Sequence, residues 1–155
     1  MKQLTPLKMI DIPPVWLLGA LAIAWQVGRL RPFGLSFGGP WADLLGGLLV
    51  GGGVLLMVLA VVEMRRRRTT VIPHLEPDAL VTSGIFSRTR NPIYVGDVLV
   101  LAGLILRWDA VLALPLIPVF LGILERRFVI PEEDRLRRTF RMQFAQYCQK
   151  VRRWV

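Results

Sequence analysis

Long apolar runs alternate with short basic segments along the chain. Four of these runs, at residues 15–27, 44–62, 93–106 and 110–124, are almost free of charge, and the only charged side chain inside them is Asp97. A helix of about 20 residues crosses the hydrocarbon core of a bilayer, and shorter runs are completed by flanking aromatic and Arg side chains. The pattern therefore predicts an all-α integral membrane protein with about four transmembrane helices. The predicted spans cover residues 14–30, 42–63, 93–107 and 109–125.

The third and fourth apolar runs are separated only by Arg107-Trp108-Asp109, which predicts a helical hairpin that crosses the membrane and returns. Tryptophan favours the membrane interface, so Trp108 fits the turn of this hairpin. The second span contains Gly47 and Gly51 in a GxxxG relation, a pattern that lets another helix pack closely. The segments before and after the hairpin should emerge on the same membrane face.

The distribution of charge orients the predicted spans. The chain is 54% hydrophobic and has a formal net charge of +9, with Lys and Arg gathered between the apolar runs. A soluble domain that binds nucleic acid would spread them over one surface, so we expect no nucleic-acid partner. With a cytoplasmic N-terminus, all Lys and Arg residues except Arg29, Arg31 and Arg107 fall inside, as the positive-inside rule requires. A multi-pass protein with both termini in the cytoplasm is predicted.

The first apolar run has some features of a cleaved signal peptide. Lys2 and Lys8 precede it, and small-x-small sequences occur at residues 20–24. The apolar stretch before those residues is too short and opens with two prolines, which favours a retained span. Cys148 is the only cysteine of the chain, so an internal disulfide is excluded.

Two segments outside the spans are predicted to be ordered on the cytoplasmic side. Residues 69–92 form a loop that is long for so small a protein, and interleaved apolar residues argue against disorder. Residues 131–152 are predicted to form an amphipathic helix with acidic residues in its first turn. A basic helix of this kind lies on the membrane surface or packs over the spans. Its apolar stripe consists of Leu136, Phe140, Phe144, Tyr147 and Val151.

The predicted hairpin brings two charged sequences together. Residues 90–96 (RNPIYVG) enter the third span, and Glu132-Glu133 open the tail helix. Arg90 can bind a carboxylate, Tyr94 can stack or donate a hydrogen bond, and the glutamates can bind an ammonium group or ribose hydroxyls. This set suits a cationic or zwitterionic cofactor. The structural alternative is an Arg–Glu ion pair that joins the loop to the tail.

Asp97 lies near the start of the third span, where a carboxylate is costly unless it is paired or hydrated. It is either an interfacial residue that reaches the headgroups or Arg90, or a member of a site. His74, Glu76 and Asp78 alternate in the loop, but Pro77 interrupts them, and we expect no metal site.

Three stretches resemble the membrane methyltransferases that include isoprenylcysteine carboxyl methyltransferase and the phospholipid N-methyltransferases. They are TTVIPH (69–74), LVTSGIFSRTRNPIYVG (80–96) and EEDRLRRTFRMQFAQYCQKVRRW (132–154). The resemblance implies an S-adenosyl-L-methionine-dependent transferase whose cofactor lies at the cytoplasmic end of the helices. It also implies that a membrane lipid or another lipophilic acceptor enters from the bilayer.

Carried over by position, the resemblance implies a site without a metal. Arg90 and Glu133 are the implied catalytic residues: Arg90 would bind a carboxylate acceptor, and Glu133 or His74 would take the proton of an amine. A methyl sulfonium carries its own leaving group, so transfer needs positioning and exclusion of water but no covalent nucleophile. The implied cofactor-binding residues are His74, Leu80, Val81, Gly84, Arg90, Asn91, Pro92, Tyr94, Gly96, Glu132 and Glu133.

Departures from the family pattern leave the acceptor open among carboxylates, amines and thiols. Asn91 replaces a common His, Arg141 stands where Gly usually follows Phe140, Phe144 replaces a frequent Tyr, and Asp97 is not a usual family residue. The enzymatic alternative is an NADPH-dependent membrane reductase of the sterol-reductase type, which shares an Arg-x-Pro-x-Tyr-x-Gly element but is usually longer. The other alternative is a membrane scaffold without enzymatic activity.

Overall fold

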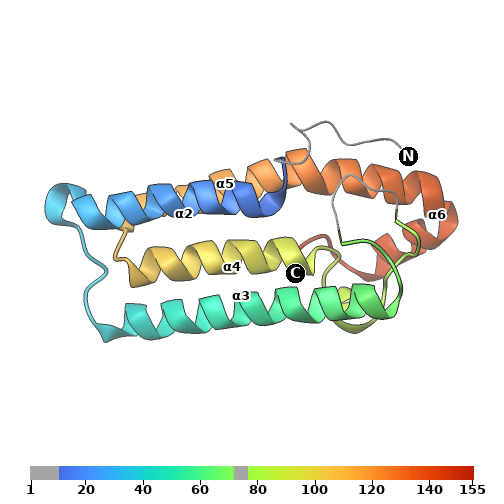
Figure 1. Ribbon diagram of the computed structural model, residues 1–155, viewed down its shortest axis with the longest axis horizontal. Coiled ribbons are helices and arrows are strands. Elements are labelled where there is room, and N and C mark those ends of the chain that lie inside the picture. The colour runs from blue at the N-terminus through green and yellow to red at the C-terminus, as the bar shows by residue number, and fades with distance from the viewer. Residues whose placement is uncertain (1–10, 72–76) are drawn as a thin grey trace.

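The computed structural model describes residues 11–71 and 77–155, and within them every regular element is a helix. The all-α class is therefore confirmed for this part of the chain. Figure 1 shows α4 between α3 on one side and the α2–α5 pair on the other. The long helices are α2 (Pro13–Leu30), α3 (Pro40–Arg66), α4 (Pro92–Arg107), α5 (Leu116–Leu124) and α6 (Ile130–Lys150). The short ones are η1 (Pro32–Gly34), η2 (Gly84–Ser87), η3 (Val111–Ala113) and the π-helix η4 (Glu125–Val129).

Proline marks the start of α2, α3 and α4. Pro13, Pro40 and Pro92 occupy the first turn of these helices. The missing N–H of proline is harmless there, because the first N–H groups of a helix have no intrahelical partner. These three helices consequently begin within two residues of the predicted spans.

Paired glycines bring α3 and α4 into close antiparallel contact. A Cβ atom on Gly46 would lie 2.6 Å from the carbonyl oxygen of Gly103, and one on Gly53 would lie 2.6 Å from that of Gly96. Residues seven apart return to the same helix face after about two turns. A Cβ on Gly51 would meet no described atom within 4 Å. The prediction of a GxxxG contact was wrong about the pair, since the contact uses a seven-residue spacing.

The last part of the hairpin differs from the prediction. Residues 108–115 form a wide turn that includes η3, and α5 begins at Leu116 instead of near residue 109. Pro115 is the N-cap of α5. It provides no N–H to extend a helix backwards, which accounts for the late start.

α5 continues through η4 into α6, so the fourth predicted span and the predicted tail helix form one helical rod. Pro131 has no N–H to donate to the carbonyl four residues earlier, that of Arg127. The π-turn just before Pro131 absorbs this change in the hydrogen-bond register. As a result, α6 extends beyond the start of α4 (Figure 1).

α6 is sharply kinked at Arg141, whose φ of 37° and ψ of −106° are not helical. The kink turns residues 142–150 back towards the bundle (Figure 1). The chain after α6 then reaches the segment before α4, where the N–H of Arg90 donates to the carbonyl of Arg152 over 3.1 Å.

Exposed apolar side chains are concentrated on α2 and α3. Leu44, Leu48 and Leu55 of α3 are 57–68% exposed. Among the helices of the described residues, α3 alone is long and apolar enough to cross a membrane unaided, with a mean hydropathy of 2.5. An apolar surface of this kind fits lipid better than water. The number of crossings and the orientation stay predictions.

Candidate active site

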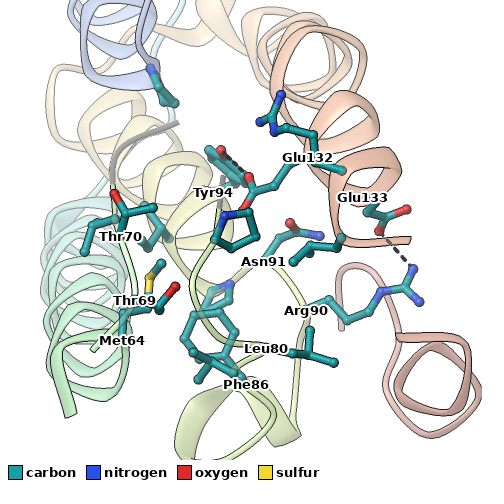
Figure 2. A pocket seen from close by; sticks show the side chains of 18 of the residues that line it. Met64, Thr69, Thr70, Leu80, Phe86, Arg90, Asn91, Tyr94, Glu132 and Glu133 are labelled. Carbon is teal, nitrogen blue, oxygen red and sulfur yellow. Dashed lines mark hydrogen bonds and ion pairs between the residues drawn. The ribbon is translucent and has the colours of Figure 1, made fainter. Parts of the chain in front are cut away.

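A cavity of about 360 Å³ lies among the loop before α4, the start of α4, the first turns of α6 and the end of α3. Its volume falls within the range of about 300–1,000 Å³ that small-molecule sites occupy. Figure 2 shows polar side chains of α4 and α6 on one side of it and Met64 with Thr69 and Thr70 on the other.

The cavity gathers most of the predicted cofactor-binding residues. Gly96 is not among its lining residues and instead packs against Gly53 and Met57 of α3. Gly84 is not among them either: it has a φ of +60°, and a Cβ there would lie 2.9 Å from Glu63 Oε2. His74 lies outside the described residues. The predicted residues that line the cavity are Leu80, Val81, Arg90, Asn91, Pro92, Tyr94, Glu132 and Glu133.

Glu133 lies between two arginines. Arg90 Nη2 is 3.0 Å from Glu133 Oε1; the Glu133 side chain is buried, at 7% exposed, and that of Arg90 is 13% exposed. Arg153 donates through Nε and Nη2 to the two carboxylate oxygens of Glu133, over 3.1 and 2.8 Å, and also pairs with Glu125. The hydrogen bonds to Glu133 raise the pKa of Arg153 above its ordinary value. The ion pair considered as the structural alternative is therefore present.

Arg90 keeps one unused donor. Its Nε is buried and has no hydrogen-bond partner among the described residues. An unpaired buried donor costs about 1–3 kcal/mol, and more for a charged group. Because Arg90 lines the cavity, a ligand with a carboxylate could satisfy this donor.

Tyr94 connects α4 to α6 at the cavity wall. Its hydroxyl donates to Glu132 Oε2 over 3.0 Å, and the dashed line in Figure 2 marks this bond. Its ring stacks on Phe128 with centroids 6.4 Å apart and an interplanar angle of 27°. The ring contact and the hydrogen bond together fix the position of the Glu132 carboxylate.

The end of the chain closes the site from outside. Asn91 Nδ2 and Thr89 Oγ1 both donate to the carbonyl of Arg153, over 2.9 and 3.2 Å. Tyr147 donates to the carbonyl of Phe86 over 2.6 Å, and burial raises the pKa of this tyrosine. The apolar stripe of α6 packs with Leu80 of the loop. The position of this helix relative to a membrane stays a prediction.

Comparison with known families identifies the class of protein. The model of the phospholipid methyltransferase family matches residues 41–143. The chain belongs to the phospholipid methyltransferase family. The suspected resemblance is thereby confirmed, and the chain is a membrane methyltransferase by class. Comparisons with curated proteins and with solved structures found no match.

Two residues at this candidate site were missed or left open by the sequence. Arg153 lies beyond the family match and was not predicted as a site residue, although it binds Glu133. Asp97 is 4% exposed and lines the cavity, so it does not reach the surface, and no ion pair joins it to Arg90 within the described residues. The cost of a carboxylate inside an apolar run was the signal that marked Asp97.

Proposed function

We propose that this protein transfers the methyl group of S-adenosyl-L-methionine to a lipophilic acceptor at the cytoplasmic face of a membrane. The observation that carries the proposal is the convergence of Arg90, Tyr94, Glu132 and Glu133 on one cavity in a member of a methyltransferase family. Small-molecule sites of this kind combine mostly apolar walls with a few converging polar groups.

The residues of the cavity fit the groups that this cofactor carries. The unpaired Nε of Arg90 would bind the carboxylate of its amino-acid part. The Glu132 carboxylate, fixed by Tyr94, would accept from its ammonium group or a ribose hydroxyl. Leu80 and Phe86 provide apolar surface for its adenine ring.

The bound cofactor supplies an electrophilic methyl group with a neutral thioether as leaving group. The protein then has to align the acceptor and keep water out, since no covalent intermediate is required. Glu133, held by Arg90 and Arg153, positions the guanidinium of Arg90 at the cavity wall. Apolar side chains of the first turn of α2 and of Met57 line another part of the cavity, which favours a lipophilic acceptor.

Cofactor binding is the first test of this function. Purified protein in detergent is incubated with labelled S-adenosyl-L-methionine, and NADPH is offered as a competitor. We expect micromolar binding that NADPH does not displace. Binding of NADPH alone would support the reductase alternative, and binding of neither would support the scaffold.

The matched variants are Glu132→Gln and Asp134→Asn. Glu132 lines the cavity, whereas Asp134 is two residues further along the same helix, is 53% exposed and pairs only with Arg137 among the described residues. Glu132→Gln should weaken binding of the cofactor, and Asp134→Asn should leave it unchanged. Equal affinities of both variants and the wild type would refute the proposed cofactor site.

A further inference from the structure

Asp97 is a buried carboxylate with an unused oxygen. Its side chain is 4% exposed, and Oδ2 has no hydrogen-bond partner among the described residues. An ionised carboxylate in an apolar setting is costly unless a cation or a donor satisfies it. Because Asp97 lines the cavity, a ligand in the cavity can supply the missing partner.

The other carboxylates of the cavity wall are already engaged. Glu133 binds Arg90 and Arg153, and Glu132 accepts from Tyr94. Figure 2 shows both glutamates on the α6 side, with dashed lines for the Glu132–Tyr94 hydrogen bond and the Glu133–Arg90 ion pair. Among the carboxylates of the cavity wall, Asp97 is therefore the best candidate to accept a proton or bind a cation.

Asp97 also lies further along α4 than the arginine cluster, which consists of Arg90, Arg153 and the Glu133 between them. It is five residues after Pro92 on α4, which places it about 7.5 Å further along the helix axis. Tyr94 is three residues before it and lies on the same face of α4. Met57 of α3 lines the cavity as well. The charged groups that line the cavity besides Asp97 are Arg90, Glu132, Glu133 and Arg135.

We propose that Asp97 binds the amino group of an amine acceptor and takes its proton before methyl transfer. This inference rests on the proposed function and names the acceptor class and a catalytic residue for it. Asp97 accepts one proton from the acceptor ammonium, which frees the nitrogen lone pair. The nitrogen forms a bond to the methyl carbon while the carbon–sulfur bond breaks, and sulfur keeps that electron pair. The proton leaves Asp97 for water when the product departs.

The same carboxylate disfavours an acceptor of the other charge. An acceptor carboxylate close to Asp97 would place two negative charges in a buried site, and like charges there are destabilising. A thiol acceptor is neutral, so it carries no positive charge that would balance the buried carboxylate of Asp97. The acceptor class that satisfies Asp97 is therefore an amine on an apolar carrier.

The test compares wild type, Asp97→Asn, Asp97→Glu and the control Asp134→Asn in proteoliposomes with labelled S-adenosyl-L-methionine. The acceptors offered are phospholipids with ethanolamine, monomethyl and dimethyl headgroups, a prenylcysteine, and a lipophilic thiol. We expect the wild type to label the amines only. Asp97→Asn should lower kcat by about 100-fold or more, the usual contribution of a general base. Asp97→Glu should restore part of the rate, and Asp134→Asn should match the wild type.

Two further measurements separate catalysis from structure. Asp97→Asn removes an unpaired buried charge, so its melting temperature in detergent should not fall below that of the wild type. Its rate deficit on the amines should shrink as the pH rises, because more acceptor amine is then already deprotonated. A wild type that labels only the carboxylate or the thiol, or a fully active Asp97→Asn, overturns the inference while cofactor binding stands. A wild type that binds no S-adenosyl-L-methionine overturns the proposed function and this inference with it.

Discussion

Replacing Gly103 by Ala should separate α3 from α4. The new Cβ would lie 2.6 Å from the carbonyl oxygen of Gly46 and 2.8 and 2.9 Å from Cγ2 and N of Val50. The first distance is about 0.8 Å less than the 3.4 Å at which ordinary contact begins, and two of the three atoms are backbone that cannot rotate away. Overpacking of this kind costs about 1–3 kcal/mol.

The matched control is Gly51→Ala on the outer face of α3. A Cβ at Gly51 would meet no described atom within 4 Å, so only helix propensity changes, which favours Ala by about 1 kcal/mol. Denaturant unfolding of both variants in the same detergent measures the two free energies. We expect Gly103→Ala to be less stable than the wild type and Gly51→Ala to be equal or more stable. Equal stability of the two variants would refute the glycine-paired interface.

The remaining predictions concern α6 and the cavity. Arg141 is exposed and has a positive φ, so Arg141→Gly should stabilise the protein by about 1 kcal/mol, measured by thermal unfolding, whereas Arg141→Ala should not. Arg153→Gln removes two hydrogen bonds from Glu133 and should weaken cofactor binding several-fold in a dialysis assay; unchanged affinity would show that the cluster does not position Arg90. Tyr94→Phe keeps the stacked ring and loses the bond to Glu132, so cofactor affinity should fall about fivefold, equivalent to about 1 kcal/mol, and an unchanged affinity would contradict the role of this hydroxyl.

Charge and proline made the ends of α2, α3 and α4 predictable, because both mark places where an apolar helix begins or stops. The junction between α5 and α6 was different. Pro131 and the glutamates after it have the signature of a new helix, yet the rod continues through η4. Phe128 and Val129 of η4 are 2% and 0% exposed, so burial in the core decides this register. Local sequence patterns carry no information about that burial.

The sequence predicts only in part which glycines of α3 contact α4. Gly46 and Gly53 on α3 have the same seven-residue spacing as Gly96 and Gly103 on α4, which is a signal for one shared face. The chain offers five glycines in α3, and a GxxxG pair among them is the better-known motif. Only the antiparallel placement of α4 determines which two of them face a partner.

The sequence predicted the contacts of the site that the hairpin alone brings about. Arg90 and Glu133 flank the two ends of the hairpin, so their ion pair follows from the order of the helices. Arg153 required knowledge of the kink at Arg141, a residue type that rarely adopts positive φ. Periodicity predicted a helix as far as residue 152, which would have carried Arg153 away from Glu133.

The arginine cluster and Asp97 are suited to different roles in the site. Two arginines hold the carboxylate of Glu133: Arg90 pairs with one oxygen, and Arg153 donates to both. The cluster is thus suited to hold Arg90 towards an anionic part of a ligand. On the wall of the same cavity, Asp97 keeps a carboxylate oxygen without such partners, which is why we propose Asp97 as the base for an amine.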